Sequence, residues 1–129
     1  MDQSEFVAVL DVLKNYYEGL YRVDIDLLRD VFSSNAHYAT TINGELLTLT
    51  LDEYLPQLAQ RSVPADEGVP YGYEVLSVRF VGASTAVAVL ECSLFGRDYA
   101  DVLSLLRIDG RWRVQAKVFE GTVQADGAS

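Results

Sequence analysis

The chain has 129 residues and a formal net charge of −9, and half of its residues are hydrophobic. This length favours a single domain with one core, whereas the acidic balance disfavours nucleic acid and membrane surfaces as partners, because both are anionic. The first residues lack the basic and apolar regions of a secretory signal, so a cytoplasmic location is expected. The single cysteine, Cys92, excludes an internal disulfide and is expected to be a small buried residue.

Three helices are predicted in the first half of the chain. Apolar residues recur at spacings of four and three residues between positions 6 and 20, which is typical of one helical stripe. A second, short helix follows with Asp24 as its expected N-cap, and its inward residues are Leu27, Leu28, Val31 and Phe32. Thr50 begins a capping-box pattern, which predicts a third helix that runs to about Arg61.

Six β-strands are predicted around and after the third helix. The dipeptide Asn43-Gly44 favours the positive φ angles of a tight turn and predicts a hairpin. After a loop at residues 62–72, four more strands are expected, over Tyr73–Val81, Thr85–Leu94, Tyr99–Ile108 and Arg111–Phe119. Residues 1–121 are expected to form one domain, and residues 122–129 a polar C-terminal tail. Helices followed by a strand meander belong to the α+β class.

The strand Tyr99–Ile108 is apolar on both faces. Alternation places one set of side chains on one face, namely Ala100, Val102, Ser104, Leu106 and Ile108, and the other set on the opposite face, namely Tyr99, Asp101, Leu103, Leu105 and Arg107. If the first face packs on the helices, Leu103 and Leu105 need another cover. A second copy of the sheet is the simplest cover, so we expect a homodimer through the sheet face.

Two segments resemble the nuclear transport factor 2-like superfamily. "YYEGLYRVDIDLLRDVFSSNAHY" is similar to its first two helices, and "DYADVLSLLRIDGRWRVQAKVF" to its terminal hairpin, in the version found in the SnoaL-like and small bacterial "putative lumazine-binding" groups. The resemblance implies a cystatin-like α+β roll, in which a cone-shaped, curved, mixed or antiparallel sheet wraps round three helices. Such cones host isomerases, dehydratases, cyclases, binding modules and assembly modules, so the resemblance implies no single activity.

The ketosteroid isomerases of this superfamily offer a residue-by-residue comparison. Their chemistry needs a carboxylate base, a tyrosine and a protonated carboxylic acid. By counting from the turns, the tyrosine position falls on Tyr16, the base on Thr40 and the second acid on Ser104. Steroid isomerisation is therefore not expected, because a threonine hydroxyl needs an activating partner to act as a base. A slip of the count across the hairpin would bring His37 or Asp101 into the site.

The remaining polar residues predict neither a metal site nor a cofactor. His37 is the only histidine, and alternation places it opposite Tyr38 and Thr40, so a solvent-facing position is the preferred interpretation. One histidine without neighbouring carboxylates cannot supply the ligands of a zinc ion. The basic residues near the last hairpin are interpreted as a solvated rim, which includes Arg107, Arg111, Arg113 and Lys117.

The preferred hypothesis is a homodimer that binds a small apolar or aromatic molecule in the cone. Tyrosines, with an apolar ring and a polar tip, suit such a ligand, and the expected lining residues are Tyr16, Tyr38, Thr40, Cys92 and Ser104. The alternative is a dehydratase, isomerase or cyclase in which Tyr16 donates a hydrogen bond and His37 or Asp101 is the base. It gains support if either residue lies in a buried cavity within reach of Tyr16. A second alternative is an assembly module, for which a filled cone and an exposed apolar sheet face are expected.

Overall fold

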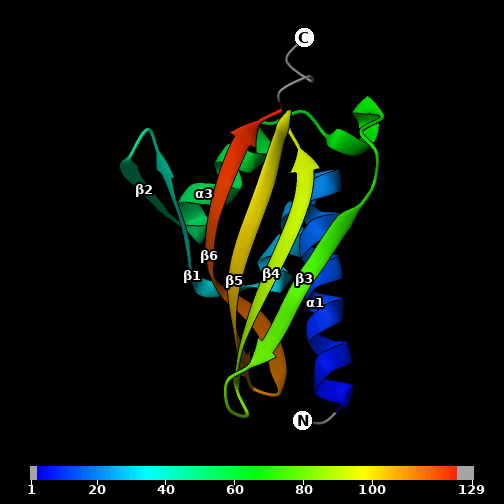
Figure 1. Cartoon of the computed structure of the whole chain (residues 1–129), viewed down its shortest axis with the longest axis vertical. Coiled ribbons are helices and arrows are strands. Elements are labelled where there is room, and N and C mark those ends of the chain that lie inside the picture. Colours follow the sequence, from blue (N-terminus) through cyan, green and yellow to red (C-terminus); the bar gives the residue numbers. More distant parts are fainter. Residues whose placement is uncertain (1–2, 125–129) are drawn as a thin grey trace.

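The computed structural model describes residues 3–124 and has the predicted α+β architecture (Figure 1). The helical elements are α1 (Gln3–Arg22), α2 (Ile25–Val31), α3 (Leu51–Ala59) and the short 3₁₀ helix η1 (Pro64–Glu67). The strands are β1 (Phe32–Ile42), β2 (Glu45–Thr50), β3 (Tyr73–Phe80), β4 (Thr85–Leu94), β5 (Arg97–Ile108) and β6 (Arg111–Val123). Strand β6 therefore includes the first two residues of the expected tail, and residues 125–129 of that tail lie outside the described residues.

The strands form one curved, open sheet with the order β2-β1-β6-β5-β4-β3. Every neighbouring pair is antiparallel except β1 and β6, which are parallel. The helices lie on one side of this sheet, where the core forms, and the other side is open to solvent (Figure 1). This arrangement confirms the mixed sheet wrapped round helices.

Local sequence signals account for several element boundaries. The Asp24 carboxylate accepts a hydrogen bond from the main-chain N–H of Leu27 at 3.1 Å and caps α2 as predicted. Thr50 and Glu53 complete the predicted capping box of α3. The first helix differs slightly, since Val9 is fully buried whereas Phe6 is 40% exposed. The predicted stripe is confirmed at Leu13, Tyr17 and Leu20 and differs near its start, where Val9 is buried in place of Phe6.

The two faces of β5 are the reverse of the expectation. Asp101, Leu103 and Leu105 are buried against the helices, whereas Val102 is 42% exposed. The expected packing of the Val102 face on the helices is therefore wrong. The larger apolar side chains, Leu103 and Leu105, take the inner face together with Asp101, because residues two apart on a strand face the same side. The register shift opposite Ser104 and Leu105 lies on β6, where Gln115 is the extra residue.

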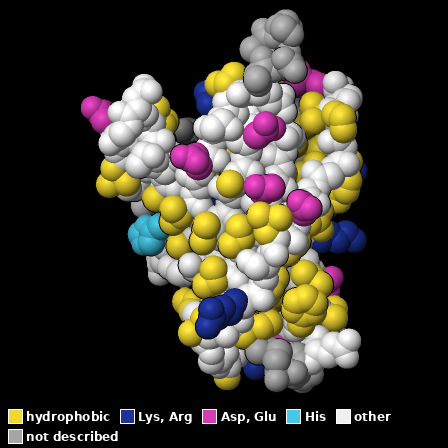
Figure 2. Space-filling model, in the orientation of Figure 1, with side chains coloured by type: hydrophobic (Ala, Val, Ile, Leu, Met, Phe, Trp, Pro, Cys, Tyr) yellow, Lys and Arg dark blue, Asp and Glu magenta, His cyan; other side chains and the backbone are white. Residues whose placement is uncertain are grey.

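The outer face of the sheet is divided into zones along the strands. Register places Glu74, Glu91, Ala100 and Glu120 in one row across four strands, followed by an apolar row that contains Val89, Val102, Val118 and Ala39. Arg79 and Arg113 lie farther along the same face. Figure 2 shows this order as acidic side chains near the upper end and a hydrophobic band beneath them.

None of the helices within residues 3–124 has the length and apolar character that crossing a membrane requires.

Candidate functional site

Two charged side chains lie inside the cone. Asp101 on β5 is 2% exposed and Lys117 on β6 is 5% exposed, although the core around them is apolar. Burial of a charged group is costly unless other groups compensate it. Buried ionisable residues of this kind are common at binding and catalytic sites, so Asp101 and Lys117 define the candidate site.

Asp101 is held by a tyrosine of the first helix. Tyr16 of α1 donates its hydroxyl to Oδ2 of Asp101 at 2.6 Å, and both side chains are buried. Burial, followed by the nearby Asp101 carboxyl, raises the pKa of Tyr16 well above its usual value, so Tyr16 remains the donor. The second carboxyl oxygen, Oδ1, is buried and has no hydrogen-bond partner among the described residues.

Lys117 lies in a cage of aromatic rings. Its Nζ is 4.9–5.4 Å from the ring centres of Tyr16, Tyr38, Tyr54 and Phe119. Burial by itself lowers the pKa of Lys117, but the neighbouring Tyr54 and Asp101 raise it, and the net shift is upward. Within residues 3–124 no carboxylate lies within 4.0 Å of Nζ. The ammonium is therefore stabilised by the ring faces and by Asp101 across a gap.

That gap is a small cavity, here called the chamber, with a volume of about 20 Å³. Its charged lining residues are Asp101, Lys117 and Arg61, Cys92 adds a thiol, and its aromatic walls include Tyr38, Tyr99 and Phe119. The volume suits one water-sized group with polar partners. Burial, and then the charge of Asp101, raises the pKa of Cys92 to about 12, so its thiol is not a ready nucleophile near neutral pH.

A much larger open cleft adjoins the chamber. It has a volume of about 970 Å³ and lies between the loop 69–72 and the paired ends of β4, β5 and β6. Four residues line both hollows, namely Cys92, Leu94, Phe95 and Tyr99. These side chains are the partition between the open cleft and the chamber.

The structure brings together four of the predicted site residues, Tyr16, Tyr38, Cys92 and Asp101. Thr40 is buried, but its hydroxyl donates to the main-chain carbonyl of Phe119 at 2.6 Å and does not line the chamber. The other two predicted residues lie elsewhere.

Ser104 and His37 are outside the cone. Ser104 pairs with Val87 and Ala116 in an outer row, so its assignment as a lining residue and as the second-acid position is corrected: Asp101 is the acid beside Tyr16. His37 is exposed, as its alternation with Tyr38 predicts. The candidate base His37 therefore lies away from the chamber, because odd and even positions of a strand face opposite sides.

The inward position of Lys117 differs from the expectation of a solvated rim. The sequence contains one weak signal for this position. Lys117 and Phe119 are two residues apart near the end of β6, so their side chains lie on the same face of the strand. Alternation cannot be followed back to Trp112, because the register of β6 against β5 shifts opposite Ser104 and Leu105. The ring contributed by Tyr54 comes from α3, and only the tertiary fold shows that it reaches Lys117.

Comparison with known proteins assigns the chain to a family. Residues 4–120 match the model of the family described as "Putative lumazine-binding". The chain belongs to this family. No similar protein was found among the curated proteins.

Solved structures related to this family member have the same fold. An NTF2-like protein of unknown function from Silicibacter pomeroyi is 25% identical, with a TM-score of 0.81, over 95% of this chain and 100% of its own. A second one, from Shewanella baltica, is 22% identical, with a TM-score of 0.84, over 96% and 98% of the two chains. A domain of unknown function with a cystatin-like fold from Nostoc punctiforme is 17% identical, with a TM-score of 0.68, over 98% and 82%. These neighbours establish the nuclear transport factor 2-like fold of the chain.

Proposed function

We propose that the protein binds a small, flat, largely apolar or aromatic molecule, with a polar group of the ligand in the chamber. The observation that carries this proposal is the buried Oδ1 of Asp101, which has no hydrogen-bond partner within residues 3–124, on a residue that lines the same cavity as Lys117. A buried acceptor without a hydrogen bond lowers the stability of the protein. A ligand group that donates a hydrogen bond to it removes this penalty, which favours binding. Lys117 supplies a donor on the other side of the same group.

The size of the chamber limits how such a ligand lies. About 20 Å³ accommodates one hydroxyl or amide group and excludes a whole ring. The body of the ligand must therefore extend past the partition toward the 970 Å³ cleft, where Tyr71 and Tyr73 add aromatic surface. This placement combines an apolar body with one deep polar anchor, which is typical of small-molecule sites.

Native mass spectrometry of the protein purified from its own host tests the binding proposal. The wild-type protein is expected to carry a reproducible small-molecule adduct, which Asp101→Asn loses or retains at a much lower level. Ser104→Ala, on the same strand but the opposite face, is the matched control and should keep the adduct. Wild-type protein without an adduct, or equal adduct on Asp101→Asn, would count against the proposal.

One observation favours catalysis as a second candidate function. Asp101 lies in a buried cavity at hydrogen-bond distance from Tyr16, which is the arrangement expected of a dehydratase, isomerase or cyclase. In such a reaction the Asp101 carboxylate accepts a proton from the substrate, and the Lys117 ammonium stabilises the negative charge that develops. Incubation of the adduct in D₂O separates this function from binding alone. Catalysis predicts carbon-bound deuterium in the molecule recovered from the wild type, whereas binding alone predicts none.

We also propose that a second copy of the chain covers the outer face of the sheet. Its apolar row is exposed, with Val118 at 51%, and lies between the acidic row that contains Glu91 and the arginines Arg79 and Arg113. A two-fold axis running across the strands brings the acidic row of each copy toward the arginines of the other. The face is thus self-complementary in charge and apolar at its centre.

Light scattering coupled to size-exclusion chromatography tests this association. We expect the wild type to elute as a dimer of about 29 kDa, twice the 14.3 kDa of the chain. Val102→Glu places a charge in the apolar row and should give monomers, whereas Val7→Glu, on the exposed side of α1, should leave the dimer intact. A monomeric wild type, or a dimer that survives Val102→Glu, contradicts the proposed interface.

A further inference from the structure

The turn between β4 and β5 contains an unusual residue. Phe95 has φ +55° and Gly96 has φ +74°, so both residues of this two-residue turn are left-handed. The turns at Asn43-Gly44 and Asp109-Gly110 have nearly the same angles. Asparagine and aspartate tolerate this conformation, but a bulky aromatic residue is strained in it. Two of these turns therefore have a residue that tolerates the left-handed conformation, Asn43 or Asp109, whereas the third has Phe95, which does not.

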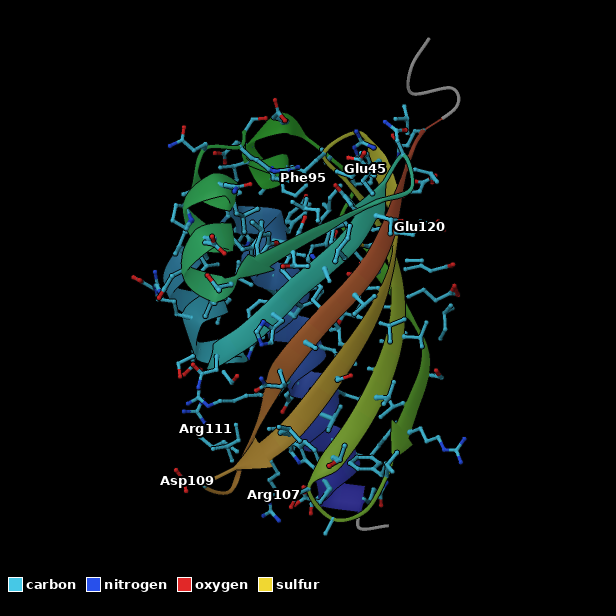
Figure 3. The ribbon with its side chains drawn as sticks, turned by 90° about the vertical axis from the view of Figure 1, so that its left-hand side faces the viewer. Glu45, Phe95, Arg107, Asp109, Arg111 and Glu120 are labelled. Atoms are coloured by element: carbon cyan, nitrogen blue, oxygen red, sulfur yellow. The ribbon has the colours of Figure 1, made fainter. Side chains whose placement is uncertain are left out.

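The phenylalanine ring occupies a junction between hollows. Phe95 borders the chamber, the open cleft and a third hollow of about 290 Å³ beside η1, and among residues 3–124 it alone lines all three. The guanidinium carbon of Arg61, just beyond α3, is 4.8 Å from the centre of the ring. Figure 3 shows Phe95 at the end of the molecule where the helical segments after β2 meet the sheet.

We propose that Phe95, stacked against Arg61, is the gate that determines which molecules reach Asp101 and Lys117. This inference rests on the proposed binding function and deepens it by naming the residue that controls access. The strained turn holds the ring between cleft and chamber, and strain of this kind persists where the surroundings favour it. Because the ring belongs to a hairpin tip, it can move without disturbing the core strands. A ligand that enters from the cleft displaces this ring first.

The two lysines of the chain give a ligand-free test of the gate. Lys14 is exposed on α1, whereas Lys117 lies in the chamber, so carbamylation by potassium cyanate compares an open amine with a gated one in the same molecule. Peptide mass spectrometry gives both rates. In the wild type, Lys117 should react much more slowly than Lys14. In Phe95→Asn, the ratio of the Lys117 rate to the Lys14 rate should rise on the order of tenfold, since the turn remains favourable but the ring is absent.

Three further measurements make this result specific. Arg61→Ala, which removes the stacking partner and leaves the turn unchanged, should raise the ratio in the same direction but less. Arg97→Ala, on the same hairpin and away from the chamber, should leave it at the wild-type value. The melting temperature of Phe95→Asn should stay within a few degrees of the wild type, because relief of backbone strain offsets the lost ring contacts.

The gate is contradicted by an unchanged ratio in Phe95→Asn, by an equal rise in Arg97→Ala, or by a large fall in melting temperature. These rates are measured on protein that has been unfolded and refolded to remove any adduct, so none of these outcomes depends on a ligand. A gate confirmed by cyanate together with an empty native mass spectrum would thus remove the binding function and keep the gate. An unchanged rate ratio in Phe95→Asn together with a clear adduct would contradict the gate and support the binding function.

Discussion

Asp101→Ala is expected to lower the free energy of unfolding by about 3–5 kcal/mol, because it removes one member of a buried charged pair. The Tyr16 hydroxyl loses its acceptor at 2.6 Å, and the Lys117 ammonium remains in the core with only aromatic rings around it. Asp101→Asn keeps an acceptor for Tyr16 and should therefore cost less. Chemical unfolding at pH 7 and fixed protein concentration, followed by fluorescence of the single tryptophan, measures each value.

The matched control for this prediction is Ser104→Ala. Ser104 lies three residues along the same strand but on the outer face, so its substitution should change the free energy of unfolding by less than about 0.5 kcal/mol. If Asp101→Ala also costs less than about 1 kcal/mol, Asp101 and Lys117 do not depend on each other, and the electrostatic description of the chamber is wrong.

Alkaline pH is expected to destabilise the wild type more than Cys92→Ala. The pKa of Cys92 rises from an ordinary value of 9.0 to about 12 in the folded protein, chiefly because the thiol is buried. A raised pKa means that the unfolded chain loses this proton first, so stability from Cys92 is fully present below pH 9 and declines as the pH rises toward 12. At pH 11 the decline should be about 2–3 kcal/mol.

Unfolding curves at pH 7, 9 and 11 for both proteins measure this effect. The raised pKa values of Tyr16 and Lys117 act in the same direction and remain in both proteins, so each loses stability and the difference between the two isolates the thiol. Cys92→Ala also changes the free energy of unfolding at pH 7. The prediction is therefore tested only by how the difference in free energy of unfolding between the two proteins changes with pH. Parallel pH profiles would show that the folded thiol ionises as readily as the unfolded one.

The fold could be predicted because its boundaries depend on local signals. Asp24 caps α2 through its own side chain, Thr50 and Glu53 cap α3, and Asn43-Gly44 sets a turn whose φ angles few other residues adopt. These interactions involve residues within three or four positions of each other. A sequence shows such neighbours directly.

The candidate site could be predicted only in part, because it depends on which face of a strand lies inside. Strand β5 is apolar on both faces, so alternation alone could not show that Asp101 and not Ser104 faces Tyr16. Strand β6 has a register shift, which hides the fact that Lys117 lies inward. In both cases the answer comes from helices far away in the sequence: Tyr16 of α1 lies 85 positions from Asp101, and Tyr54 of α3 contributes a ring to Lys117.

The parallel pairing of β1 with β6 has a consequence for how this chain folds during synthesis. Strand β6 is made after the other five strands of the sheet, yet it lies between β1 and β5 in the middle of the sheet. Helices α1 and α2 and the hairpin β1–β2 therefore leave the ribosome before the strand that joins them to the meander exists. Long-range pairings of this kind are slow to form and leave strand edges exposed in the meantime. Nascent chains that stop before residue 111 should thus depend on chaperones.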